Sequence, residues 1–300
     1  FHLGDFYEMF GEDAKTASKV LNITLTSRSK GDSAMPLAGF PVHAAKDYIE
    51  KLLTAGHKVA ICDQVEDPAK AKGIVKREVT RVITPGTLLD EGLLRSDRNN
   101  YLAALSPGKD GVGFAYVDLS TGEFAVAELD RSALADELSR IRPSELLVPE
   151  SVAGEEGAGY AGEGAGLSGC RSSPYPEWAF DPETAQRRLL EHFKVKTLDG
   201  LGCDGLEMAQ SAAGALLRYL EETHKAGLEH ITDIAVVDEQ DYLAFDGEAL
   251  RNLEILETIH DRRKEGALLG VLDCTVTAPG ARRLRQWIVR PLAKRDAIVS

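Results

Sequence analysis

The sequence has 300 residues, of which 43% are hydrophobic and 28% charged, an ordinary composition for a globular protein of two or three domains. No run of about eighteen apolar residues occurs and no signal-peptide pattern opens the chain, so we expect neither a membrane span nor secretion. Its four cysteines form no CxxC pair, which argues against a zinc or disulfide framework and indicates reduced thiols in a cytoplasmic protein.

The formal net charge of −13 is unevenly distributed. Residues 1–100 hold 14 basic and 14 acidic side chains, residues 101–269 carry a charge of −17, and residues 270–300 carry +4. The acidic middle is a poor partner for polyanions, whereas the two ends are not excluded from binding nucleic acid. Because the first residue is Phe rather than Met, we interpret the chain as a fragment.

The first hundred residues predict a compact α/β domain. The helices are marked by apolar residues at helical spacing and by a closing Gly56, and the strands by β-branched, alternating runs. We predict strands over 1–10, 23–28 and 57–64, a further strand from Val79 that ends at Pro85-Gly86, helices over 11–21 and 43–55, and a loop over 29–41.

A second unit begins near Tyr101 and a third near Ile231. Residues 111–129 predict a hairpin around the turn Ser120–Gly122, because both halves alternate and Gly122 favours a turn. We predict helices over 133–141, 183–193 and 207–223, a strand over 145–149, a flexible Gly-rich loop over 154–169, and then a strand over 241–246 with helices over 247–260 and 277–289.

Two nucleotide-binding motifs can be set aside. Gly157, Gly159 and Gly162 have the spacing of a dinucleotide-binding motif, but further glycines follow where that motif requires a helix. No P-loop occurs, since the only Gly-Lys pair is followed by Asp110. We therefore predict no cofactor in these residues.

Asp118 is the candidate for an enzymatic alternative. It ends the first strand of the predicted hairpin, the position at which nucleases of the ribonuclease-H type hold a metal, and such chemistry needs several converging carboxylates. Glu123 and Glu145 are its available partners. A solvated or turn-stabilising Asp118 fits the pattern better.

Phe6 and Glu8 point the same way if residues 6–8 are extended, because side chains alternate along a strand. One interpretation places Phe6 in the core with Glu8 paired locally. The other is a minor-groove wedge: an apolar side chain that unstacks a base step costs a few kcal/mol, less where pairing is already broken. A neighbouring carboxylate would then hydrogen-bond the displaced base and repel intact duplex.

A basic stretch, Lys70, Lys72, Lys76 and Arg77, precedes the strand predicted to begin at Val79. It is either a solvated face or a rim that contacts phosphates.

Several long motifs resemble the MutS family of DNA mismatch repair proteins, in that family's order and spacing. They are GDFYEMF, DAKTASKVLNITLTSR, MPLAGFPVHA, LLTAGHKVAICDQVEDP and REVTRVITPGT, and further on RNLEILETI and KEGALLGVLDCTVTAPGARRLRQWIVRPL. The resemblance covers nearly the whole chain and is weakest between about 150 and 230.

The resemblance implies an α/β multidomain fold. Residues 1–95 would be a mixed α/β mismatch-recognition domain, 98–235 a ribonuclease-H-like connector without nuclease activity, and 237–300 the start of an α-helical lever and core domain. Phe6 would be the intercalating aromatic and Glu8 the carboxylate at the mispaired base. Further DNA contacts would come from Arg28, Pro36, Leu37, Gly39, His43, Lys72, Lys76 and Arg77.

The resemblance also implies partners and cofactors for the intact protein. These are mismatched duplex DNA, a second MutS subunit, MutL, and ATP with magnesium in an ATPase domain beyond Ser300, in a cytoplasmic protein of bacterial type. This fragment itself would not be an enzyme. The alternatives are a MutS-like paralogue that binds other DNA junctions, disfavoured by the Phe-x-Glu pair, and a metal-dependent nuclease centred on Asp118.

Overall fold

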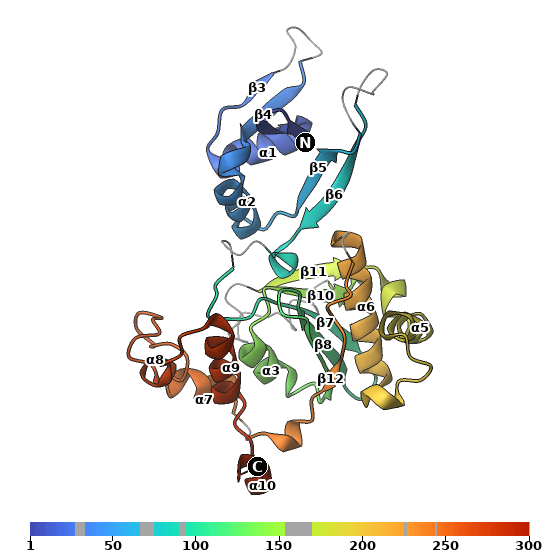
Figure 1. The fold of residues 1–300 in the computed structure, drawn as a ribbon, viewed down its shortest axis with the longest axis vertical. Coiled ribbons are helices and arrows are strands. Elements are labelled where there is room, and N and C mark those ends of the chain that lie inside the picture. Colours follow the sequence, from blue (N-terminus) through green and yellow to red (C-terminus); the bar gives the residue numbers. More distant parts are fainter. Residues whose placement is uncertain are drawn as a thin grey trace. The chain divides into compact units, whose positions relative to one another are not determined.

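The computed structural model describes residues 1–27, 34–66, 75–89, 94–153, 170–224, 227–243 and 245–299. They form two compact units: Phe1–Leu88 with Leu220–Gly227, and Leu89–Tyr219 with Leu228–Ser300 (Figure 1). Among these described residues, no helix is long and apolar enough to cross a membrane.

The first unit is built on a four-stranded antiparallel sheet. In spatial order its strands are β1 (His2–Leu3), β2 (Phe6–Phe10), β4 (Pro36–Pro41) and β3 (Thr26–Ser27). The single strand predicted over 1–10 is therefore two strands. Gly4 makes the turn between them with a φ of +60°, a conformation that glycine adopts readily.

Two helices and a separate hairpin complete the first unit. They are α1 (Gly11–Leu21), α2 (Ala45–Thr54), and the pair β5 (Val59–Gln64) and β6 (Arg77–Ile83). The predicted helices and the strand that ends at Gln64 are confirmed. Leu21, Phe40 and Leu52 form one buried cluster, and Ile49, Ile61 and Ile83 belong to a second.

The loop predicted over 29–41 is wrong at its C-terminal end, because Pro36–Pro41 forms the central strand β4. Ala38 and Phe40 are buried at alternate positions, so burial overrides the turn preferences of the flanking prolines. The strand predicted over 23–28 is reduced to Thr26–Ser27 within the described residues.

The second unit contains a six-stranded mixed sheet. Its strands, in spatial order, are β11 (Arg171–Tyr175), β10 (Glu145–Pro149), β7 (Tyr101–Pro107), β8 (Val112–Asp118), β9 (Glu123–Leu129) and β12 (Ala235–Val236). The middle three are antiparallel, and the outer three join them in parallel. The predicted hairpin is confirmed with Val117 opposite Phe124.

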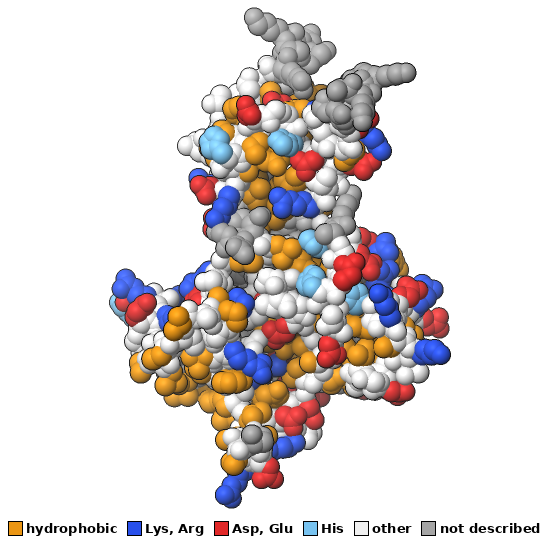
Figure 2. All heavy atoms as spheres, viewed as in Figure 1, with side chains coloured by type: hydrophobic (Ala, Val, Ile, Leu, Met, Phe, Trp, Pro, Cys, Tyr) orange, Lys and Arg blue, Asp and Glu red, His pale blue; other side chains and the backbone are white. Residues whose placement is uncertain are grey.

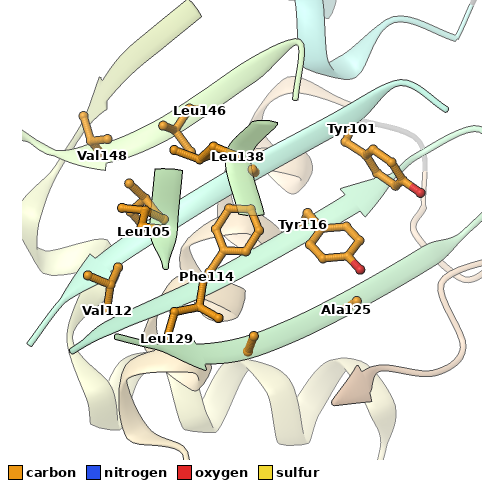
Figure 3. Close-up of a cluster of buried hydrophobic side chains, with 13 residues drawn as sticks. Tyr101, Leu105, Val112, Phe114, Tyr116, Ala125, Leu129, Leu138, Leu146 and Val148 are labelled. Atoms are coloured by element: carbon orange, nitrogen blue, oxygen red, sulfur yellow. The ribbon is translucent and has the colours of Figure 1, made fainter. Parts of the chain in front are cut away.

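Helices cover both faces of this sheet, in agreement with the predicted α/β class (Figure 1). On one face α3 (Leu134–Ile141) buries Leu138 against Leu105, Phe114 and Leu146, as Figure 3 shows. On the other face lie α5 (Pro182–Phe193) and α6 (Glu207–Thr223). Gly113 lets α6 approach closely, since an added Cβ would lie 2.0 Å from the Met208 carbonyl carbon.

The C-terminal segment forms a small helical cluster. Its helices are α7 (Gly247–Asn252), α8 (Leu268–Leu272), α9 (Ala278–Val289) and α10 (Arg295–Val299). The strand predicted over 241–246 is wrong: Tyr242 makes an isolated bridge with Leu292, and residue 244 lies outside the described residues. The helix predicted over 247–260 ends at Asn252. Figure 2 shows hydrophobic side chains gathered over α7 and α8, where Leu253 and Val271 are exposed.

Polar contacts hold α9 to the sheet of the second unit. The Nε2 of Gln286 donates to the Glu123 carboxylate at 2.7 Å and to the Tyr101 hydroxyl at 3.1 Å. Just beyond α9, Arg290 donates to Glu137, a carboxylate that is only 1% exposed and also accepts from Arg140. A buried charge needs partners of this kind, because its hydration is lost.

Candidate nucleic-acid interface

Strand β2 separates a core face from an outer face. Tyr7 and Met9 pack against the buried cluster of Leu21 and Phe40, whereas Phe6 and Glu8 point the other way. The Phe6 side chain is 46% exposed. The expected alternation is therefore present, and the interpretation that places Phe6 in the core is wrong.

Aromatic packing on the core side supports this strand. The Tyr7 and Phe40 ring centroids are 6.1 Å apart, and Phe40 stacks on Tyr48 at 4.8 Å. Burial, followed by the charge of Asp63, raises the pKa of the Tyr7 hydroxyl above its usual value. The exposed Phe6 is thus carried by a strand whose opposite face is fixed by packed rings.

Phe6 and Glu8 border one open groove with a volume of about 460 Å³. Its other lining residues are Asn22, Ile23, Thr24, Thr26, Leu37 and Gly39. The groove thus combines an aromatic ring, a carboxylate and several hydroxyl and amide groups. A nucleic-acid base offers a matching pair of properties, an apolar face and a polar edge.

Glu8 lies opposite Gly39 in the pairing of β2 with β4. A Cβ at position 39 would lie 2.9 Å from the Tyr7 carbonyl oxygen and 3.4 Å from the Glu8 Cγ. The missing side chain therefore leaves room for the Glu8 side chain. Within the described residues the Glu8 carboxylate makes no hydrogen bond or ion pair, so its oxygens remain available as acceptors.

The other predicted DNA contacts fall into three groups. Leu37 and Gly39 line the groove, and Pro36 lies beside it, paired with Ser27. His43 is exposed in the turn before α2 but does not line the groove. Arg28 and Lys72 lie outside the described residues.

Lys76 immediately precedes β6 and Arg77 begins it, and neither is among the groove residues. The Lys76 ammonium pairs with Glu78 at 2.7 Å, and this hydrogen bond raises the pKa of Lys76. Arg77 donates to the Val75 carbonyl oxygen at 3.3 Å. Neither side chain therefore shares the groove that Phe6 lines.

Sequence reasoning missed one wall of the groove, formed by Asn22, Ile23, Thr24 and Thr26. Asn22 ends α1 in a left-handed conformation, with a φ of 53°, which turns the chain back along β4. A usable signal was present, because Asn tolerates this conformation and often ends helices.

Asp118 is a buried turn residue. One carboxylate oxygen accepts from the backbone and hydroxyl of Ser120 at 2.8 and 2.6 Å, and the other from Asn99 at 2.8 Å. Its turn-stabilising role is confirmed, whereas solvation is wrong because the residue is fully buried.

The two other carboxylates of the nuclease alternative are arranged differently. Asn99 also donates to Glu123 at 3.2 Å, so Glu123 does lie beside Asp118. Glu145 accepts from Ser173 and from Tyr219 of α6, on the opposite face of the sheet. Among the described residues, no group of three or more His, Cys, Asp and Glu side chains could hold a metal ion.

Three family models match the chain in order: MutS domain I over residues 1–92, MutS domain II over 100–232 and MutS domain III over 248–300. Curated proteins named DNA mismatch repair protein MutS, from Symbiobacterium thermophilum, Halothermothrix orenii and Chlorobaculum tepidum, are 46%, 43% and 44% identical to it. These alignments cover 97%, 99% and 100% of the chain but only 34%, 33% and 34% of the relatives. The chain thus spans about a third of their length.

Proposed function

Because the chain belongs to the MutS family, we propose that it recognises mismatched and unpaired bases in duplex DNA and so initiates mismatch repair. The observation that carries this proposal is the outer face of β2. There, a 46% exposed Phe6 borders the same groove as the Glu8 carboxylate, which has no partner among the described residues. Because the Phe6 ring is exposed, the fold loses the hydrophobic stabilisation that burying it would give. Contact between the ring and a base offsets that loss.

Phe6 acts as a wedge that enters a base step from the minor groove. Unstacking an intact step costs a few kcal/mol, and a mismatch lowers this cost because its pairing is already weakened. Every 1.4 kcal/mol of that difference corresponds to about a tenfold preference in binding. The wedge therefore selects sites that deform easily, without reading one particular sequence.

Glu8 supplies the polar part of recognition. A base displaced by Phe6 turns a hydrogen-bonding edge toward the groove, and the Glu8 carboxylate accepts from it. Over intact duplex the same charge faces phosphates without that compensation, which disfavours binding. Arg28, Pro36, Leu37, Gly39, His43, Lys72, Lys76 and Arg77 are proposed as contacts that hold the duplex in place.

The proposal divides the chain into the recognition domain (1–95), a connector (98–235) and the beginning of the lever and core domain (237–300). A ribonuclease-H-like description of the connector is supported by a sheet that starts with three antiparallel strands and continues in parallel. Lack of nuclease activity is supported by Asp118 and Glu145, which face opposite sides of that sheet.

For the intact protein we propose an ATPase that uses ATP and magnesium in its C-terminal part, pairs with a second MutS subunit and binds MutL. The same proposal places it in the cytoplasm. ATP-driven clamp switching would require the rest of the protein.

The test uses the full-length product of this reading frame. A fluorescent G·T heteroduplex and its matched homoduplex are titrated, at one stated salt concentration, with wild type, Phe6→Ala and Leu25→Ala. Leu25, at 45% exposure, is a matched control because it does not line the groove. Wild type and Leu25→Ala should prefer the heteroduplex, and Phe6→Ala should bind both duplexes alike. A folded Phe6→Ala variant that still discriminates as well as wild type would contradict the proposal.

A further inference from the structure

Four segments of the second unit meet beside α9. They are the stretch around Arg98, the C-terminal end of α3 at Arg142, the loop after α7 at Glu257, and Arg285 on α9 itself. Two polar contacts join these segments in pairs: Arg282 of α9 donates to the Ser96 carbonyl oxygen at 3.2 Å, and Arg142 pairs with Glu257 at 3.1 Å. Ile255 and Leu256, just before Glu257, pack in one cluster with Leu284 of α9, which joins the two pairs. The charges of Arg98 and Arg142 act on the Arg285 guanidinium.

Among the described residues, positive charge exceeds negative charge in this cluster, where Arg95, Arg98, Arg142 and Arg285 face Asp97 and Glu257. Both of these carboxylates are engaged, Asp97 by Arg95 at 3.2 Å and Glu257 by Arg142. Arg98 and Arg285 form no side-chain hydrogen bond or ion pair with any described residue. The Nε of Arg98 is buried and has no hydrogen-bond partner in the part of the chain that the structure describes.

Such an arrangement is unfavourable when the cluster is empty. A buried charged donor without a partner costs more than a neutral one, and like charges repel at short range. The pKa of Arg285 is lowered to about 10, first by burial and then by the charges of Arg98 and Arg142. The pKa of Arg98 is also lowered, by burial and by Arg95. An anion seated among these groups would remove both penalties.

We propose that Arg98, Arg142 and Arg285 form a binding site for a phosphate group. A guanidinium presents N–H donors in a planar fork that matches two phosphate oxygens, and arginines on different elements can approach a tetrahedral anion from different sides. The phosphate can come from a nucleotide or from the DNA backbone. This site is independent of the Phe6 groove, and its occupancy would fasten the stretch around Arg98 to α9.

The experiment follows the thermal unfolding of this chain by tryptophan fluorescence. Both tryptophans, Trp178 and Trp287, belong to the second unit, and Trp287 lies two residues beyond Arg285. Inorganic phosphate is titrated at constant ionic strength, with chloride as the balancing anion. At about ten times its Kd, phosphate should raise the wild-type Tm by about 3–5 °C.

Two variants decide the result. Arg285→Gln should lose the phosphate-dependent rise in Tm yet be at least as stable as wild type in chloride, because it removes a buried charge that Arg98 and Arg142 repel. Arg263→Gln, a matched change at an exposed arginine, should keep the full rise. General stabilisation of folded proteins by phosphate would act on all variants alike. Equal rises in wild type and Arg285→Gln, or no rise in wild type, would overturn the proposal.

Further titrations identify the source of the phosphate. ATP without magnesium and a matched DNA duplex replace inorganic phosphate. A rise with ATP alone indicates a nucleotide, and a rise with duplex indicates the DNA backbone; each must disappear in Arg285→Gln. Phe6→Ala should keep the phosphate response, so failure of this site and failure of mismatch recognition give different results.

Discussion

Glu8 and Gly39 face each other across strands β2 and β4, and the missing side chain at position 39 gives the carboxylate its space. The backbone is equally close, because a Cβ on residue 39 would lie 2.9 Å from the Tyr7 carbonyl oxygen. Sheet geometry and the position of the Glu8 side chain therefore depend on the same glycine.

Gly39→Ala should push β4 away from β2. Because the close neighbour is backbone, relief requires strand movement, at a cost of about 1–3 kcal/mol. Hydrogen exchange of the β2 and β4 amides should become faster in this variant. Gly200→Ala is the control, since a Cβ there meets nothing within 4 Å. Unchanged exchange in Gly39→Ala would show that the sheet absorbs the methyl group.

Glu8→Gln should weaken discrimination by improving binding to the wrong substrate. The amide carries no charge, so repulsion by the phosphates of intact duplex disappears, and affinity for matched DNA should rise by up to about tenfold. The rise should shrink as salt is added. Fluorescence titration at two salt concentrations measures both effects. Glu12→Gln, a neutralisation on α1 that does not line the groove, should leave homoduplex affinity nearly unchanged.

Glu137→Gln should destabilise the second unit strongly. The substitution leaves the guanidinium groups of Arg140 and Arg290 buried against a neutral amide, and breaking a buried pair typically costs about 3–5 kcal/mol. Urea unfolding followed by tryptophan fluorescence reports the change. Glu229→Gln, at an exposed glutamate, should cost less than about 0.5 kcal/mol. Similar urea midpoints for the two variants would mean that the ion pairs of Glu137 with Arg140 and Arg290 contribute little net stability.

Glu123 should make the stability of the second unit depend on pH. Burial, assisted by the charge of Asp118, raises the pKa of this carboxyl although hydrogen bonds from Tyr101 and Gln286 oppose the rise. The folded state therefore binds the proton more tightly than the unfolded state. The contribution of Glu123 to the free energy of unfolding is therefore complete below its pKa in the unfolded state, about 4.3. It is lost as the pH rises through its pKa in the folded state.

The comparison is between wild type and Glu123→Gln, unfolded in urea at several pH values between about 4 and 8. Relative to the variant, wild type should be most stable at the acidic end and should lose that advantage toward pH 8. A difference that stays constant, or that grows with pH, would contradict a raised pKa.

The spacing of apolar residues along the sequence predicted the helices and the hairpin better than it predicted strands β4 and β7. The alternation along Phe6, Tyr7 and Glu8 sufficed to place two of these side chains on one face. Strand β7 went unassigned because its residues are buried on both faces of the sheet, which removes the period-two signal. Strand β4 was hidden by its prolines and Gly39, whose turn preferences are overridden by pairing on both sides.

The site was only partly predictable for a related reason. Phe6 and Glu8 are two positions apart, so local geometry relates them. The wall around Asn22 and Thr24 reaches the groove through the fold of the sheet, which no local pattern encodes. Asp118 ends strand β8 and Glu145 begins strand β10, and the fold turns their side chains to opposite faces of the sheet.

The contacts of α9 tie the C-terminal part of the second unit to strands and a helix that lie much earlier in its sequence. Gln286 and Arg290 grip Glu123 and Glu137 directly, although more than 150 residues separate them along the chain. A force applied to α9 therefore reaches the sheet first through these side-chain hydrogen bonds. Only afterwards is it transmitted along the backbone around Val237. The helix and the sheet therefore move as one body. If a protease cleaved the backbone around Val237, the two resulting fragments should stay associated.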